Sequence, residues 1–143
     1  MKQDKLGNLI SLFFSTSQII RGRLHRYGKI DPFSHLQLET LQFIEKRKSC
    51  NMKEVAEYLH ISAPSATSLV NNLVKFGWLK RVHDKQDRRV VNLVITDKGE
   101  KMVSDGSAHT NECMREILSA LNNKEISDFA KILYKLSEDN SKK

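Results

Sequence analysis

The stretch that decides the fold runs from residue 62 to residue 99 and reads SAPSATSLVNNLVKFGWLKRVHDKQDRRVVNLVITDKG. Its second half holds two short apolar runs, 78–83 and 90–95, on either side of a charged loop, 84–89. The second run is rich in β-branched residues and too short for a helix. The two-residue repeat of a strand places three of its apolar residues on one face, so the pattern predicts a β-hairpin. These residues are Val91, Leu93 and Ile95.

The first half of this stretch predicts a helix, and a shorter helix precedes it. Ser62 is a favourable N-cap, and Pro64 falls in the first turn, where a missing N–H is tolerated. Gly77 suits the left-handed position that follows the last turn. The shorter helix begins at Asn51, which forms a capping box with Glu54. Two short helices in succession are typical of a helix-turn-helix, although any helical hairpin gives the same pattern.

The outward face of the helix that begins at Ser62 carries short hydrogen-bonding groups and one base. No acid occurs between Ser62 and Lys75. A solvated helix face usually mixes acids and bases, whereas a face free of acids suits the phosphate oxygens and base edges of DNA. The residues that point away from the apolar side are Pro64, Thr67, Ser68, Asn71, Asn72 and Lys75.

The rest of the chain predicts amphipathic helices on both sides of this stretch. One long apolar stripe spans 6–27 and ends where Gly28 and Asp31-Pro32 interrupt it. Ser34 opens the next helix, whose buried side consists of Leu38, Leu41 and Ile44.

Two more helices follow the hairpin. Thr96 caps a helix that we expect to run through Leu121, and Asn122 with Glu125 forms the capping box of the last helix. The polar tail over 137–143 is expected to fray. The predicted fold class is therefore mainly α with a small β-hairpin wing.

The positive charge of the chain is concentrated near the predicted hairpin. The chain has 143 residues and a formal net charge of +7. Residues 75–101 contain eight Lys or Arg and four Asp or Glu, an excess of four positive charges. A basic surface favours a polyanionic partner such as double-stranded DNA.

Several classes of protein are excluded by the sequence. It contains no apolar run of about 18 residues, so no membrane span is expected. The two cysteines form no disulfide framework, which favours a reducing cytoplasm. Glycine-rich phosphate loops, a nucleophile elbow and paired carboxylates are all missing, so we expect neither an enzyme nor a bound cofactor.

Three motifs in this order resemble the multiple antibiotic resistance regulator (MarR) family. They are Gly77-Trp78-Leu79, then Asp84-x-x-Asp87-Arg88-Arg89, then Leu93-x-Ile95-Thr96-x-x-Gly99. The resemblance implies a winged helix-turn-helix core, 34–96, and N- and C-terminal dimerisation helices, 1–33 and 97–143. It implies a bacterial or archaeal transcriptional regulator, usually a repressor, that binds a palindromic operator as a homodimer. The alternative is a ligand- or protein-binding helical module without specific DNA binding.

The resemblance also assigns roles to individual residues. Arg89 matches the family's wing arginine, which enters the minor groove, and Asp87 matches the acid that steadies it. Asp84 is expected to stabilise the wing by pairing with Arg88. The further DNA-binding candidates are Ser62, Pro64, Ser65, Thr67, Ser68, Asn71, Lys75, Lys85 and Arg88, with Gln86 at the tip and Lys80, Arg81 and Lys98 as extra phosphate contacts.

Three kinds of signal remain open for such a regulator. The first is a small-molecule effector that binds between the dimerisation helices and the winged domain, on aromatic surface from Phe13, Phe14, Tyr27, Phe33 and Phe43. The second is a thiol switch at Cys113 or at Cys50, where the neighbouring bases Lys46, Arg47 and Lys48 would lower the pKa.

The third kind of signal is a metal ion bound by His109 and Cys113, which lie one turn apart on a predicted helix. The pattern is incomplete, because no third ligand follows from the sequence. The candidates for completing it are Glu112, Glu116, His25 and His35.

Overall fold

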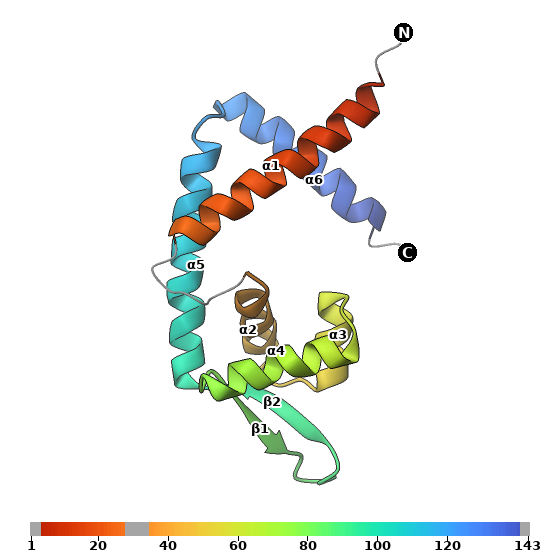
Figure 1. Cartoon of the computed structure of the whole chain (residues 1–143), viewed down its shortest axis with the longest axis vertical. Coiled ribbons are helices and arrows are strands. Elements are labelled where there is room, and N and C mark those ends of the chain that lie inside the picture. Colours follow the sequence, from red (N-terminus) through yellow and green to blue (C-terminus); the bar gives the residue numbers. More distant parts are fainter. Residues whose placement is uncertain (1–3, 28–34, 141–143) are drawn as a thin grey trace. The chain divides into compact units, whose positions relative to one another are not determined.

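The computed structural model describes residues 4–27 and 35–140, which form six helices and two strands (Figure 1). None of the helices in these ranges is long and apolar enough to cross a membrane. The elements are α1 (Lys5–Tyr27), α2 (His35–Arg47), α3 (Met52–Leu59), α4 (Ala63–Lys75), β1 (Leu79–His83), β2 (Val91–Ile95), α5 (Asp97–Leu118) and α6 (Asn123–Asn140). The predicted order and the mainly helical fold class are confirmed.

The chain divides into two compact units. Residues 28–109 form one unit, here called the winged unit, which holds α2, α3, α4, the hairpin and the first half of α5. Residues 1–27 and 110–143 form the other, here called the helical unit.

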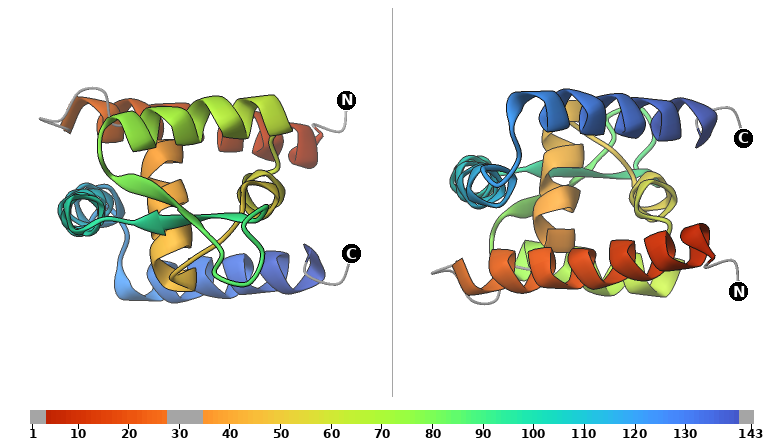
Figure 2. Two further views of the ribbon diagram at one scale, coloured as in Figure 1. Left: turned by 90° about the horizontal axis from the view of Figure 1, so that it is seen from below. Right: turned by 90° about the horizontal axis from the view of Figure 1, so that it is seen from above.

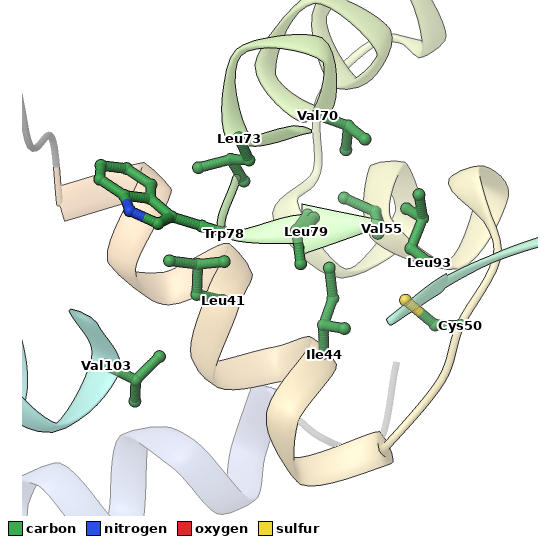
Figure 3. Close-up of a cluster of buried hydrophobic side chains, with 10 residues drawn as sticks. All are labelled: Leu41, Ile44, Cys50, Val55, Val70, Leu73, Trp78, Leu79, Leu93 and Val103. Atoms are coloured by element: carbon green, nitrogen blue, oxygen red, sulfur yellow. The ribbon is translucent and has the colours of Figure 1, made fainter. Parts of the chain in front are cut away.

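The core of the winged unit is a single cluster of buried apolar side chains to which every one of its elements contributes (Figure 3). The two strands are antiparallel, with Leu79 opposite Ile95 and His83 opposite Val91. β2 packs against α2, which the hairpin crosses in the view of Figure 2 (left). Fully burying a side chain of this size contributes about 1.5–3 kcal/mol, so the cluster dominates the stability of the unit. Its members are Leu41, Ile44, Cys50, Val55, Val70, Leu73, Trp78, Leu79, Leu93 and Val103.

The helix boundaries inside the winged unit follow the predicted caps. Asn51 and Glu54 form a complete capping box at the start of α3. Ser62 caps α4 by accepting the Ser65 N–H. At the other end of α4, Gly77 has a φ of +77°, and the N–H groups of Gly77 and Trp78 return to carbonyls of the last turn, which is a Schellman motif.

One junction ties the end of α4, the base of the hairpin and the start of α5 together. The Thr96 hydroxyl donates to the Gly77 carbonyl (2.6 Å) and accepts the Gly99 N–H (3.1 Å). The Thr96 N–H donates to the Trp78 carbonyl (3.0 Å). A Cβ atom at Gly99 would overlap that same Trp78 carbonyl, so only glycine permits this approach.

Three predicted boundaries are wrong. α5 ends at Leu118, and Leu121 lies in the following turn, because Asn122 must leave helical geometry to cap α6. α6 continues to Asn140, since nothing in its sequence interrupts the helix after residue 136. The hairpin loop spans 84–90 and is one residue longer than predicted. The predicted breaks at Gly28 and Asp31-Pro32 and the opening at Ser34 lie outside the described residues.

Candidate nucleic-acid interface

The acid-free face of α4 lies at the surface. Its hydroxyl groups are already ordered by local bonds: the Ser62 hydroxyl donates to that of Ser65 (2.8 Å), and the Thr67 hydroxyl donates to the Ala63 carbonyl (3.0 Å). Each hydroxyl keeps acceptor capacity for an incoming donor. The exposed residues of this face are Ser62, Pro64, Ser65, Thr67, Ser68, Asn71, Asn72 and Lys75.

Arg81 is held against this face rather than left extended in solvent. Its Nη2 atom donates to Oδ1 of Asn71 at 2.6 Å, which joins β1 to α4. From the sequence, Arg81 was expected only as one more phosphate contact, and its bond to Asn71 was not predicted. The two residues are ten positions apart on different elements, so no local pattern in the sequence signals the pairing.

The Asp84 side chain orders the wing loop by accepting hydrogen bonds from the loop backbone. Its Oδ1 atom accepts the N–H groups of Gln86 (2.8 Å) and Asp87 (3.1 Å). The prediction of an ion pair between Asp84 and Arg88 is wrong. Among the residues described, these two side chains form no ion pair, and the Asp84 carboxylate accepts the two backbone N–H groups instead. A short side chain that reaches the backbone two and three residues on is the usual way for aspartate to order a turn.

Asp87 and Arg89 form an ion pair at the tip of the wing. Asp87 Oδ1 accepts the Arg89 backbone N–H (3.0 Å) and Nε (3.1 Å), and Oδ2 accepts Nη2 (3.3 Å). These hydrogen bonds hold the pKa of the Asp87 carboxyl below its ordinary value, so the pair persists as the pH falls through that value. The side chain of Arg89 is 91% exposed and therefore accessible to a partner.

Two further side chains, one beside the wing loop and one beside the end of α4, hydrogen bond to backbone carbonyls. The Nδ1 atom of His83 donates to the Arg88 carbonyl (2.9 Å), which braces the loop from β1. Lys98 Nζ donates to the Phe76 carbonyl (2.9 Å) and so satisfies the C-terminal end of α4. Lys80, Lys85 and Arg88 are exposed.

Cys50 is not the reactive thiol that the sequence suggested. Its side chain is 2% exposed and belongs to the core, and its backbone pairs with Leu93 in both directions. Burial, reinforced by the charge of Glu54, raises the pKa of the Cys50 thiol to about 11, and the opposing influence of Arg47 is smaller. The prediction of a lowered pKa is therefore wrong: nearby bases in the sequence do not compensate for desolvation.

The proposed metal ligands do not gather into a site. Among the described residues, no group of three or more His, Cys, Asp or Glu side chains could hold a metal ion. Cys113 is 1% exposed and lies on the apolar side of α5, which fits a small buried hydrophobic residue.

The described aromatic candidates for effector binding belong to both units: Phe13 and Phe14 to the helical unit and Phe43 to the winged unit. Phe13 and Phe14 are exposed on α1, with ring centroids 5.8 Å apart. Phe43 stacks on Tyr58 at 4.1 Å and lies beside a cavity of about 510 Å³, whose lining includes Lys46 and Arg47. Tyr58 was not predicted. The Tyr27 side chain and Phe33 lie outside the described residues.

Comparison with known proteins finds similarity to one family of transcriptional regulators. The family model described as MarR family matches residues 33–91. The HTH-type transcriptional repressor MdtR of Bacillus subtilis is 29% identical over 102 residues, which cover 71% of this chain and 66% of MdtR.

Two solved structures share the fold over nearly the whole chain. The YusO protein of Bacillus subtilis has a TM-score of 0.75 at 26% identity. The aligned region covers 96% of this chain and 99% of the YusO chain. A mutant of MarR from E. coli, complexed with operator DNA, has a TM-score of 0.77 at 20% identity over 94% of this chain and 99% of its own. At this level of identity the second likeness establishes the fold alone.

We predict that neither cysteine of the native protein reacts quickly with thiol reagents near neutral pH. Because the pKa of Cys50 is about 11, its reactive thiolate is scarce at pH 7.5 and increases only as the pH approaches that value. The measurement is the rate of reaction with a disulfide reagent at pH 7.5, with the denatured protein as the control. A native rate equal to the denatured rate would contradict the burial described here.

Proposed function

This chain belongs to the MarR family of transcriptional regulators, and we propose that it represses transcription as a homodimer bound to a palindromic operator. The observation that carries the proposal is the combination of an exposed, acid-free helix face on α4 with an exposed arginine held at the tip of the wing. The first element suits a major groove and the second a minor groove. The site of action we propose is the cytoplasm of a bacterium or archaeon.

We propose that α4 lies in the major groove, which is wide enough to admit a helix. The Ser62 end of α4 faces the bases, as the N-terminal residues of a recognition helix do. Lys75, at the other end, lies near the phosphate backbone. The proposed contacts are Ser62, Pro64, Ser65, Thr67, Ser68, Asn71 and Lys75, with Lys85 and Arg88 contributing from the wing.

We propose that Arg89 enters the minor groove. A guanidinium group fits the negative potential of a narrow, A·T-rich groove. The bonds from Asp87 fix the Arg89 backbone and side chain, so less conformational entropy is lost when the arginine binds. Asp84 supports the same arrangement by ordering the loop.

The homodimer is supported by apolar surface that a single chain leaves uncovered. Many large side chains of α1 and α6 are between 45% and 71% exposed. Exposed apolar surface of this extent marks an interaction site, and a twofold dimer presents two copies of α4 to the two half-sites of a palindrome. We therefore propose 1–33 and 97–143 as the dimerisation region and 34–96 as the DNA-binding domain. The exposed residues include Leu6, Leu9, Phe13, Phe14, Phe129, Leu133, Tyr134 and Leu136.

We also propose a small-molecule effector with an apolar ring and a negative charge. The cavity beside Phe43 is lined by both stacked rings, Phe43 and Tyr58, which offer apolar surface to the ring of the effector. Lys46 and Arg47 offer positive charge to the anionic group, although Arg47 also pairs with Glu54 at 2.8 Å.

The wing assignment predicts a loss of affinity in Arg89→Ala. Against the duplex that the wild-type protein selects from a random library, we expect affinity to fall about tenfold and the salt dependence to lose about one unit of slope. Fluorescence anisotropy at several salt concentrations measures both. Lys131→Ala is the matched control, because Lys131 is also exposed and ion-paired, with Asp128 on α6. Unchanged affinity and slope in Arg89→Ala would refute the wing assignment.

The dimer assignment predicts that Phe129→Asp separates the two protomers. A charge placed in an apolar interface is costly, so the variant should sediment at 16.5 kDa and the wild type at twice that mass. Leu136→Asp provides a second variant on the same helix, and Lys131→Ala again serves as the control. A wild-type protein that sediments as a monomer at micromolar concentration rules out the dimer.

The effector assignment predicts that Phe43→Ala makes DNA binding insensitive to the ligand. We expect one member of a panel of small aromatic carboxylates to weaken the wild-type DNA complex about tenfold, and Phe43→Ala to lose that response while binding DNA normally. Anisotropy of the DNA complex during titration gives the result. A response lost in Phe14→Ala but retained in Phe43→Ala would move the effector site to α1.

A further inference from the structure

The bond between Arg81 and Asn71 lies on the surface that carries the proposed DNA contacts. Asn71 is an exposed residue of α4, and Arg81 is an exposed residue of β1, the strand that follows α4 in the chain (Figure 1). The Arg81 Nη2 atom and the Asn71 Oδ1 atom are 2.6 Å apart. The bond therefore determines which end of the Asn71 amide remains available to a partner.

The orientation of this amide follows from the chemistry of its partner. The oxygen and nitrogen of an asparagine amide are hard to tell apart by shape alone. A guanidinium group, however, has five N–H donors and no acceptor. The amide atom that faces Arg81 must therefore be the carbonyl oxygen, and the two N–H groups of Nδ2 remain free to donate elsewhere.

A donor-presenting asparagine does not suit every base equally. The bidentate pairing of asparagine with adenine uses the carbonyl oxygen to accept from N6 and the amino group to donate to N7. Here Arg81 occupies part of the acceptor capacity and places a positive charge beside it, which disfavours an approaching amino group. The major-groove edge of guanine presents two acceptors, N7 and O6, and matches the free Nδ2 group.

We propose that Arg81 is a positioning residue for base recognition, which orients Asn71 so that its amino group reads guanine in the major groove. The inference rests on the proposed DNA-binding function and deepens it. It differs from the simpler expectation that Arg81 contacts a phosphate, because a phosphate contact strengthens binding to all sequences alike.

The test is selection of preferred duplexes from a random library by the wild-type protein and by variants, followed by sequencing. The base pair whose preference disappears in Asn71→Ala is the one that Asn71 reads, and we expect guanine there for the wild type. In Arg81→Ala the amide is free to rotate, so the preference for guanine over adenine at that pair should fall about fivefold while the other positions keep theirs.

A matched control and a double variant separate orientation from charge. Lys80→Ala removes the same charge from the neighbouring position of β1, where side chains point to the opposite face of the strand, and should leave every base preference unchanged. In the Asn71→Ala background, Arg81→Ala should cause no further change in base preference, because the residue that it positions is gone.

Three results would overturn the inference. Arg81→Ala could lower affinity equally for all sequences with unchanged preferences, which would make Arg81 a phosphate contact. The wild type could select adenine at the pair that Asn71 reads. Both results leave the proposed regulator function intact, whereas a wild-type protein that selects no sequence overturns that function and this inference together.

Discussion

The arrangement of the winged unit depends on the contact between Gly99 and the Trp78 carbonyl. Three elements meet there: α4 ends, the hairpin closes and α5 begins. The Thr96 hydroxyl bonds to both sides of the junction, and the missing side chain at Gly99 lets the first turn of α5 approach the backbone. Because α4 and β1 are separated only by Phe76, Gly77 and Trp78, this contact also sets the direction in which α4 faces outward.

The sequence was most informative where an interaction connects residues a few positions apart. The caps at Asn51, Ser62, Thr96 and Asn122 follow from pairs three residues apart, and all four are present in the structure. The motif Thr96-x-x-Gly99 supported the family resemblance, and the junction gives its physical reason. The end of α5 was harder to predict, since the apolar spacing continues to Leu121 after the backbone has already turned.

Features of the candidate site that depend on tertiary contacts were not accessible in this way. The bond from Arg81 to Asn71 joins two elements, and the stack of Phe43 on Tyr58 joins two helices. For Cys50, the local sequence pointed in the wrong direction, because three neighbouring bases suggested a reactive thiol while the fold buries it against Leu93. The charges near a thiol can be read from the sequence, but the effect of desolvation on its pKa depends on the packed structure.

The wing loop has a property that bears on how such proteins diverge. The bonds described for Asp84, Asp87 and Arg89 stay within residues 84–90, and His83 braces the loop from the adjoining end of β1. The shape of the loop is thus set almost entirely by its own residues. We therefore expect that a loop of another length or charge can replace it between β1 and β2 without disturbing the buried cluster.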